Sequence, residues 1–164
     1  MAKTDSFFIR ASVATDGLNY AQQSIDLGAY VDALGKSVLR IHNIAVQYGD
    51  PTDVPTVVPG SSGIIGFNLT TQSQSSMVGA ADRSIIASGK LLVTSGAGGE
   101  LSTYEGLDVA PQHWTNGYLV GVEQIYLATD QTAAVALDEI NVVLECTVET
   151  LSQSAAMALA LSQQ

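Results

Sequence analysis

The clearest signal of the fold lies in "DEINVVLECTVET", which runs from Asp138 to Thr150. Apolar residues occupy every second position from Ile140 to Val148, and polar residues fill most of the positions between them. An alternation with a period of two is typical of a β-strand that buries one face. The sequence therefore predicts a long strand here, with its apolar side on the core of a β-rich domain.

Strand-like runs recur along the rest of the chain, separated by breaks rich in Gly, Pro and Ser. With the stretch above (137–151), the predicted strands are 6–15, 23–34, 37–48, 63–71, 84–95, 100–109 and 117–129. Eight antiparallel strands without a βαβ rhythm predict an all-β jelly-roll sandwich of two four-stranded sheets. An immunoglobulin-type sandwich is not favoured, because the chain has a single Cys.

The longest predicted strand, Ser37–Tyr48, contains a shift in its alternation. Leu39 and Ile41 share one phase, whereas Ile44 follows one residue out of step. A β-bulge adds one residue to one strand of a pair and would bring both halves onto the same face. We therefore predict a bulge near His42–Asn43.

Length and composition point to one globular domain. The chain has 164 residues, of which 46% are hydrophobic and 13% charged, a balance opposite to that of disordered proteins. Three of the four prolines lie in 49–63, which predicts a long surface loop because proline cannot pair inside a sheet. We expect a β-sandwich domain over 1–148 and a helical or arm-like extension over 149–164.

The net charge of −10 is distributed unevenly. All six basic residues lie in the first 90 positions, and nine acidic residues follow from Leu91 onward. Such a surface repels phosphate groups and lacks a cluster of Lys and Arg that could release counterions. The sequence therefore predicts no direct binding of nucleic acid and no docking on an anionic membrane.

Targeting signals and disulfides are not expected. The apolar run in "AKTDSFFIR" after Met1 has three residues, which is too few for the apolar region of a signal peptide. No apolar segment reaches the roughly 20 residues that a membrane-spanning helix needs. The lone Cys146 cannot form an intrachain disulfide and lies on the apolar face of its strand. We interpret it as a core residue.

Sequences that resemble catalytic motifs are better explained as turns. "LGKS" at Leu34–Ser37 resembles the end of a phosphate-binding loop, but Tyr30 stands where that loop needs its first glycine. "GAGGE" at Gly96–Glu100 predicts a hairpin turn. His42 and His113 are isolated histidines without a spaced third ligand, which favours structural roles. We predict no catalytic residue, no cofactor and no enzyme activity.

Two weaker binding hypotheses remain open. The acidic pairs Asp50/Asp53, Glu105/Asp108 and Asp138/Glu139 could bind calcium at a subunit boundary, although none has the spacing of a dedicated calcium loop, and solvated carboxylates are the alternative. Trp114 and Tyr118, with Tyr104, could form a sugar-binding platform or pack at an interface, because aromatic residues are enriched in both.

The C-terminal stretch "ETLSQSAAMALALSQQ", 149–164, carries no charge after Glu149. It contains good helix formers, but an isolated helix of this length is marginal unless one side packs against its own sandwich or a neighbour. We expect the packed side to contain Leu151, Ala155, Ala158 and Leu159. A mobile tail is the alternative. The predicted interface residues are Trp114, Tyr118, Leu151, Met157, Leu159 and Leu161.

In its predicted strands, its Pro- and Gly-rich loops and its apolar terminal extension, the chain resembles the single jelly-roll capsid proteins of icosahedral viruses. It resembles especially those whose roll stands upright in a shell around an internal membrane. The resemblance implies a structural subunit of the virion that is made in the host cytoplasm and assembles with copies of itself and other capsid proteins. "MAKTDS" is not a basic arm, which implies that a membrane or another protein separates the genome from this chain, or that the chain is an outer component.

A jelly-roll module that binds carbohydrate or a receptor, as in a trimeric spike, is the alternative function. The arrangement of Trp114, Tyr118 and Tyr104 discriminates between the two. Exposed and coplanar rings would favour binding, and rings buried at a subunit contact would favour assembly.

Overall fold

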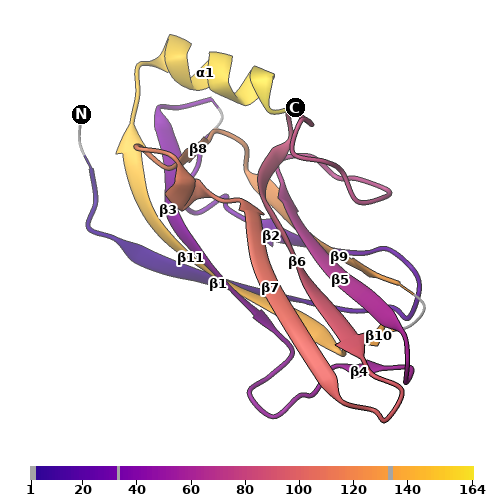
Figure 1. The fold of residues 1–164 in the computed structure, drawn as a ribbon. Helices are drawn as coiled ribbons and strands as arrows, with labels where there is room; N and C mark the ends of the chain where they lie inside the picture. The colour runs from indigo at the N-terminus through magenta and orange to yellow at the C-terminus, as the bar shows by residue number, and fades with distance from the viewer. Residues whose placement is uncertain (1–2, 33, 133–134) are drawn as a thin grey trace.

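Two antiparallel β-sheets pack face to face in the computed structural model, which describes residues 3–32, 34–132 and 135–164 (Figure 1). The first sheet has the order β1 (Phe7–Ala14), β11 (Glu139–Thr150), β3 (Ser37–Tyr48), β8 (Tyr118–Val120). The second has the order β2 (Ala21–Asp26), β9 (Gln124–Gln131), β5 (Ser62–Thr70), β6 (Ile85–Ser95), β7 (Leu101–Val109). A short ribbon joins β4 (Thr56–Val57) to β10 (Val135–Ala136), and the helices are the 3-10 turn η1 (Pro111–His113) and α1 (Gln153–Ser162).

The strand pairing is nested. β1 pairs with β11, β2 with β9, β3 with β8 and β5 with β6, and successive pairs fall alternately in the first and second sheets. The chain is thus a long hairpin wound around a common core, which is the jelly-roll topology. The prediction of an all-β jelly roll is confirmed.

Two predicted strands differ from those observed. The segment 117–129 forms two strands, β8 and β9, in different sheets, because the chain crosses between sheets at 121–123 while Val122 stays buried. The division of 117–129 into β8 and β9 gives nine strands in the two sheets, so they have four and five strands rather than four each, whereas 100–109 forms β7 as predicted. In 23–34 the strand ends at Asp26. A turn follows, in which the Leu27 carbonyl accepts hydrogen bonds from the backbone N–H groups of Tyr30 and Val31.

The core lies between the two sheets. The alternate residues of β11 from Ile140 to Cys146 are at most 1% exposed, as their pattern predicts. Fully burying an aliphatic side chain of this kind stabilises the fold by about 1.5–3 kcal/mol. Phe67 of β5 fills the space beside Gly89 of β6, where an added Cβ would lie 2.7 Å from the ring. Glycine at this position therefore makes room for the largest buried side chain.

The predicted bulge is confirmed. Glu145 of β11 pairs with Asn43, and the next residue, Cys146, pairs with Ile41. His42 is therefore the extra residue on β3, and its side chain lies on the outer side of the sheet, where Nε2 is 2.9 Å from Thr147 Oγ1.

The C-terminal stretch forms α1, which begins after the N-cap residue Ser152. The Ser152 hydroxyl accepts a hydrogen bond from the Ala155 backbone N–H, which satisfies one of the unpaired donors of the first turn. Figure 1 shows α1 lying across one end of the roll, above β8 and the ends of β3 and β11. Within the described ranges no helix is long and apolar enough to span a bilayer.

Candidate functional site

The inner side of α1 is made of small residues and one polar residue. Ala156, Ala160 and Gln163 are at most 5% exposed, whereas Ala155 and Ala158 are exposed. The expected packed side, with Leu151, Ala155, Ala158 and Leu159, is therefore wrong in phase. Of its four members, only Leu151 and Leu159 are partly buried. Small residues face the roll instead, because the backbone of α1 comes close to a glycine at this end of the roll.

That glycine is Gly121, in the crossing between β8 and β9. A Cβ added there would lie 2.9 Å from Leu159 Cγ and 3.2 Å from the Ala160 backbone nitrogen. The Gly121 N–H donates to Gln163 Oε1 (2.8 Å), and Gln163 Nε2 donates to the Leu119 carbonyl (2.7 Å). The tail thus folds back on its own chain instead of extending away as an arm.

Gln163 was not singled out from the sequence. A polar residue near a chain end ordinarily stays in water, and no local signal distinguishes Gln163 from its exposed neighbour Gln164. Its amide reaches groups more than 40 residues away in sequence. Gln163 Nε2 also lies 3.5 Å from the Tyr118 hydroxyl, and burial raises the pKa of this tyrosine.

The outer side of α1 carries larger apolar residues. Met157 is 43% exposed and Leu161 69%, one turn apart on the helix. Leu34, in the loop before β3, is 80% exposed. The Leu34 carbonyl accepts a long hydrogen bond from Gln153 Nε2 (3.4 Å), which places this loop beside α1. From Leu151 to Gln164 the sequence has no charged residue. We call Met157 and Leu161 the α1 outer pair.

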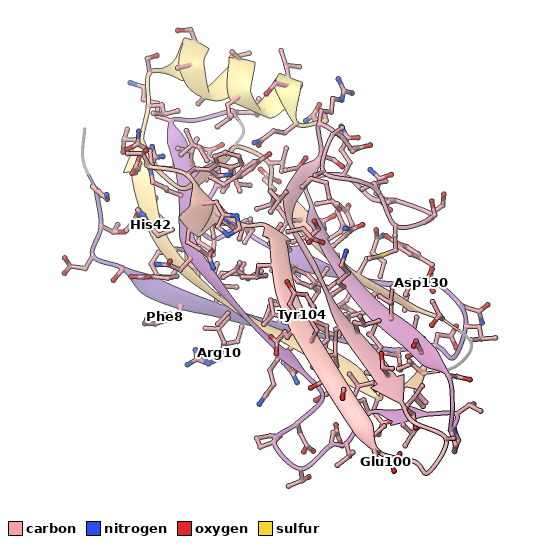
Figure 2. The ribbon with its side chains drawn as sticks, viewed as in Figure 1. Phe8, Arg10, His42, Glu100, Tyr104 and Asp130 are labelled. Carbon is pink, nitrogen blue, oxygen red and sulfur yellow. The ribbon has the colours of Figure 1, made fainter. Side chains whose placement is uncertain are left out.

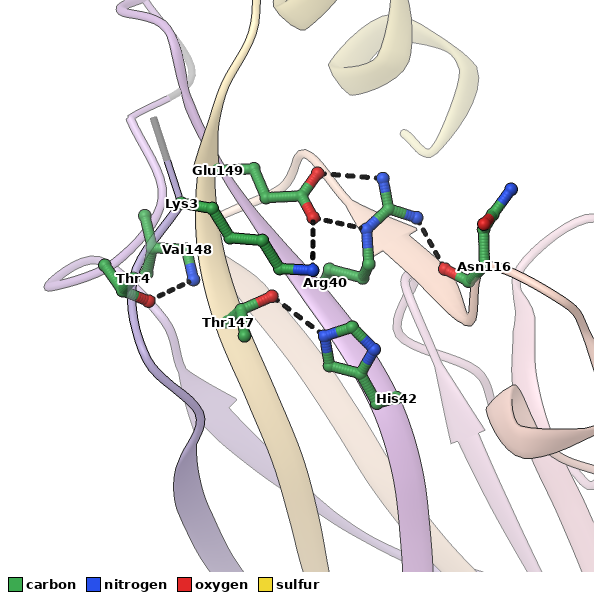
Figure 3. A network of polar contacts seen from close by, with 8 residues as sticks. All are labelled: Lys3, Thr4, Arg40, His42, Asn116, Thr147, Val148 and Glu149. Carbon is green, nitrogen blue, oxygen red and sulfur yellow. Dashed lines mark hydrogen bonds and ion pairs between the residues drawn. The ribbon is translucent and has the colours of Figure 1, made fainter. Parts of the chain in front are cut away.

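A polar network, the Glu149 clamp, lies where β11 leads into α1 (Figure 3). Glu149 is 4% exposed, and its two carboxylate oxygens accept hydrogen bonds from Arg40 Nε (2.6 Å) and Nη2 (2.8 Å). Arg40 Nη1 donates to the Asn116 carbonyl (2.5 Å), and Lys3 Nζ lies 3.7 Å from Glu149 Oε1. The hydrogen bonds from Arg40 lower the pKa of the Glu149 carboxyl.

The clamp joins segments that are far apart in sequence. Thr4 donates its backbone N–H to the Val148 carbonyl (3.1 Å), so the N-terminal segment continues along the edge of β11. After Glu149 the chain is held again, because the Leu151 N–H donates to the Lys36 carbonyl (2.8 Å). These bonds set the direction in which the chain enters α1.

The other sequence candidates for chemistry lie apart from one another. Burial raises the pKa of the Cys146 thiol to about 12, so it stays protonated at neutral pH, as suits a core residue. His113 is exposed at the end of η1. Within the described ranges, no three His, Cys, Asp or Glu side chains cluster as metal ligands would.

The predicted calcium pairs make local hydrogen bonds. Asp50 accepts from the backbone N–H and hydroxyl of Thr52 (both 2.6 Å), which lowers its pKa, and Asp53 accepts from the Asp50 N–H (2.8 Å). Glu139 accepts from Asn141 Nδ2 (2.9 Å). Calcium binding at Asp50, Asp53, Asp138 and Glu139 stays a prediction.

The three aromatic residues are not stacked on one another. Tyr104 lies on β7 (Figure 2) and is 62% exposed. Trp114 is 54% exposed in the turn after η1, and Tyr118 is half-buried beside Gln163. Ring pairs within the described ranges are Phe7–Tyr30 and Tyr48–Phe67. Because Tyr118 is half-buried, the three rings do not form a fully exposed set, and sugar binding stays an alternative prediction.

A cavity of about 450 Å³ lies on the outer face of the second sheet. Asp130 of β9, Gly66 of β5 and Lys90 of β6 form one cross-strand row, and the missing side chain of Gly66 leaves a depression between the two charges. Met77 forms a roof, with Cε 3.2 Å from where a Gly66 Cβ would stand. Ile64, 38% exposed, adds an apolar wall. We call this cavity the Gly66 hollow.

The outer face of the first sheet carries a cation next to an aromatic ring. Phe7 and Ile9 point into the core, so Phe8 and Arg10 of β1 point outward. Phe8 is 59% exposed, and the Arg10 guanidinium lies 5.9 Å from the centre of its ring. We call these two residues the Phe8–Arg10 patch.

Comparisons with known proteins show a likeness of fold. No protein-family model matches the chain, and no curated protein matches it by sequence. Among solved structures, the chain is similar to VP1 of Merkel cell polyomavirus, from a structure of the unassembled pentamer. The two sequences are 5% identical, the TM-score is 0.48, and the match covers 90% of this chain and 96% of the VP1 chain. A chain from the single-particle structure of maize chlorotic mottle virus gives 9% identity, a TM-score of 0.32, and coverage of 88% and 95%.

At these identities the likeness concerns the fold alone. The chain is similar to proteins of two viruses, as the resemblance stated from the sequence led us to expect, and its jelly-roll topology rests on the strand pairing described above. The narrower resemblance to viruses with an internal membrane stays a prediction.

Proposed function

We propose that this chain is a structural subunit that assembles with copies of itself, and with other capsid proteins, into the shell of a virion. The observation that carries the proposal is the α1 outer pair. A helix that is apolar on both sides is typically covered on both sides, and the chain's own roll covers only one side of α1. We therefore expect another copy of the chain or another capsid protein to supply the second covering surface.

The attachment of α1 to the end of the roll supports this role. The close contact at Gly121 and the hydrogen bonds of Gln163 hold the helix in place, so its outer side is presented as a rigid surface. Binding through a preformed surface avoids the entropy cost of ordering a flexible arm. Charged residues are depleted in the cores of protein interfaces, and the low content of charged residues in this chain, 13%, is compatible with burying part of its surface between copies.

The net charge of −10 suggests a position away from the genome, such as a shell outside a membrane or an outer layer.

Solution mass tests the proposal. The full chain is examined by size-exclusion chromatography with light scattering, beside Met157→Ser/Leu161→Ser, which keeps the inner side of α1 intact. We expect assemblies at multiples of 17.1 kDa for the full chain and a shift toward the 17.1 kDa monomer for the double variant. We expect the free energy of unfolding of the monomer to change by less than about 0.5 kcal/mol, since both side chains are exposed.

Leu18→Ser is the matched control. Leu18 is 62% exposed in the turn between β1 and β2, so this variant also removes an exposed leucine but leaves α1 unchanged. The proposal would be overturned by a full chain that stays monomeric up to concentrations on the order of 1 mM. A Kd of that size corresponds to a marginal contact.

A further inference from the structure

The Gly66 hollow has an excess negative charge. Lys90 Nζ lies 3.7 Å from Asp108 Oδ2, so these two half-exposed groups offset each other. Asp130 accepts the Gln131 backbone N–H (2.8 Å), and within the described ranges no cation pairs with its carboxylate. A hollow with apolar walls and an unpaired carboxylate suits a guest with an apolar body and a cationic head.

The Phe8–Arg10 patch has the complementary chemistry. Within the described ranges Arg10 forms no ion pair, and its guanidinium stays near the face of the exposed Phe8 ring. In the ion pairs of the described residues, Arg40 and Lys3 bind Glu149, and Lys90 binds Asp108. Arg10 is therefore a cation that is available to a partner and carries an apolar neighbour with it.

The patch and the hollow lie on opposite faces of the roll. The patch is on the outer side of β1 in the first sheet and the hollow on the outer side of β5, β6 and β9 in the second. Figure 2 shows Phe8 and Arg10 on one side of the molecule and Asp130 on the other. One copy cannot bring its own patch to its own hollow.

We infer that the Phe8–Arg10 patch of one copy docks on the Gly66 hollow of the next, with Arg10 beside Asp130. This inference rests on the proposed function. A contact between two different surfaces of the same chain is heterologous, so it forms rings or extended arrays and does not close as a twofold dimer. This property is the one that a shell subunit needs.

Charge reversal tests the contact by light scattering of the full chain. Arg10→Glu and Asp130→Arg each place like charges at the contact, and each should weaken association at least about tenfold. The double variant Arg10→Glu/Asp130→Arg, which restores opposite charges, should recover association to within about threefold of the wild type. An equimolar mixture of the two single variants should recover it as well, because each variant then meets an opposite charge on the other.

Matched controls separate this contact from general charge effects. Lys36→Glu and Asp16→Arg make the same changes of charge at exposed positions outside both surfaces and should associate like the wild type. Gly66→Ala tests the hollow without any change of charge. Its Cβ would meet only the flexible end of Met77 closely, so we expect weaker association at an unchanged melting temperature.

The outcomes distinguish the two proposals. If the wild type is monomeric, the proposed function fails and this inference fails with it. If the wild type assembles and Arg10→Glu, Asp130→Arg and Gly66→Ala assemble equally well, this inference is wrong and the proposed function stands. If one of the single charge variants unfolds by circular dichroism, the other single variant and Gly66→Ala decide.

Discussion

The two sides of α1 reverse the usual arrangement of a surface helix. Its buried side has the small residues Ala156 and Ala160 and the polar Gln163, whereas its exposed side has Met157 and Leu161. Surface helices typically bury their large apolar residues and expose polar ones. The inner side therefore depends on close approach and hydrogen bonds, and the outer side retains the apolar surface that a neighbour can cover.

Gly121→Val should have the largest effect on this arrangement. A Cβ at this position would overlap Leu159 and the backbone of α1, so the helix must move away from the roll. We expect a loss of about 3 kcal/mol in the free energy of unfolding. Urea unfolding in the Met157→Ser/Leu161→Ser background, where we expect a monomer, measures it.

Gly79→Val is the control for this variant, because a Cβ at Gly79 meets nothing within 4 Å. Equal stability of the two variants would show that α1 is not closely seated on Gly121.

Gln163→Ala should have the next largest effect. It leaves the Gly121 N–H and the Leu119 carbonyl without their partner, and an unsatisfied buried polar group is costly. We expect a loss of about 2 kcal/mol, again by urea unfolding. The neighbouring variant Gln164→Ala removes an exposed side chain and should change stability by less than about 0.5 kcal/mol. Equal losses in both would contradict the polar attachment of α1.

Glu149→Gln extends the comparison to the base of the helix, with a smaller effect of about 1.5 kcal/mol at pH 7. The pKa of Glu149 is lowered in the folded state, mainly by its hydrogen bonds with Arg40. Its stabilising contribution is therefore fully present above the unfolded pKa near 4.5 and is lost as the pH falls through the lower folded value.

Unfolding at pH 7 and at pH 3 provides the measurement for Glu149. The difference between the wild type and Glu149→Gln should shrink at the lower pH, and a difference that stays constant would show that the charge of Glu149 contributes nothing.

The sequence alone predicted the features that local periodicity can report. Alternation identified β11 and the inward residues of β1, and the change of phase in Ser37–Tyr48 located the bulge at His42. One-sided burial repeats every second residue along a strand, so it leaves a mark on consecutive positions. The absence of βαβ spacing then indicated a jelly roll.

The features that depend on residues distant in sequence appear only in the folded chain. The periodicity of 117–129 gave no sign that the chain changes sheets at Gly121, since Val122 is buried within the turn. The orientation of α1 follows from Gly121 and Gln163, and the Glu149 clamp joins β3 to β11 across 109 positions. Close approach and polar pairing involve partners that only the folded chain brings together, and no local period encodes them.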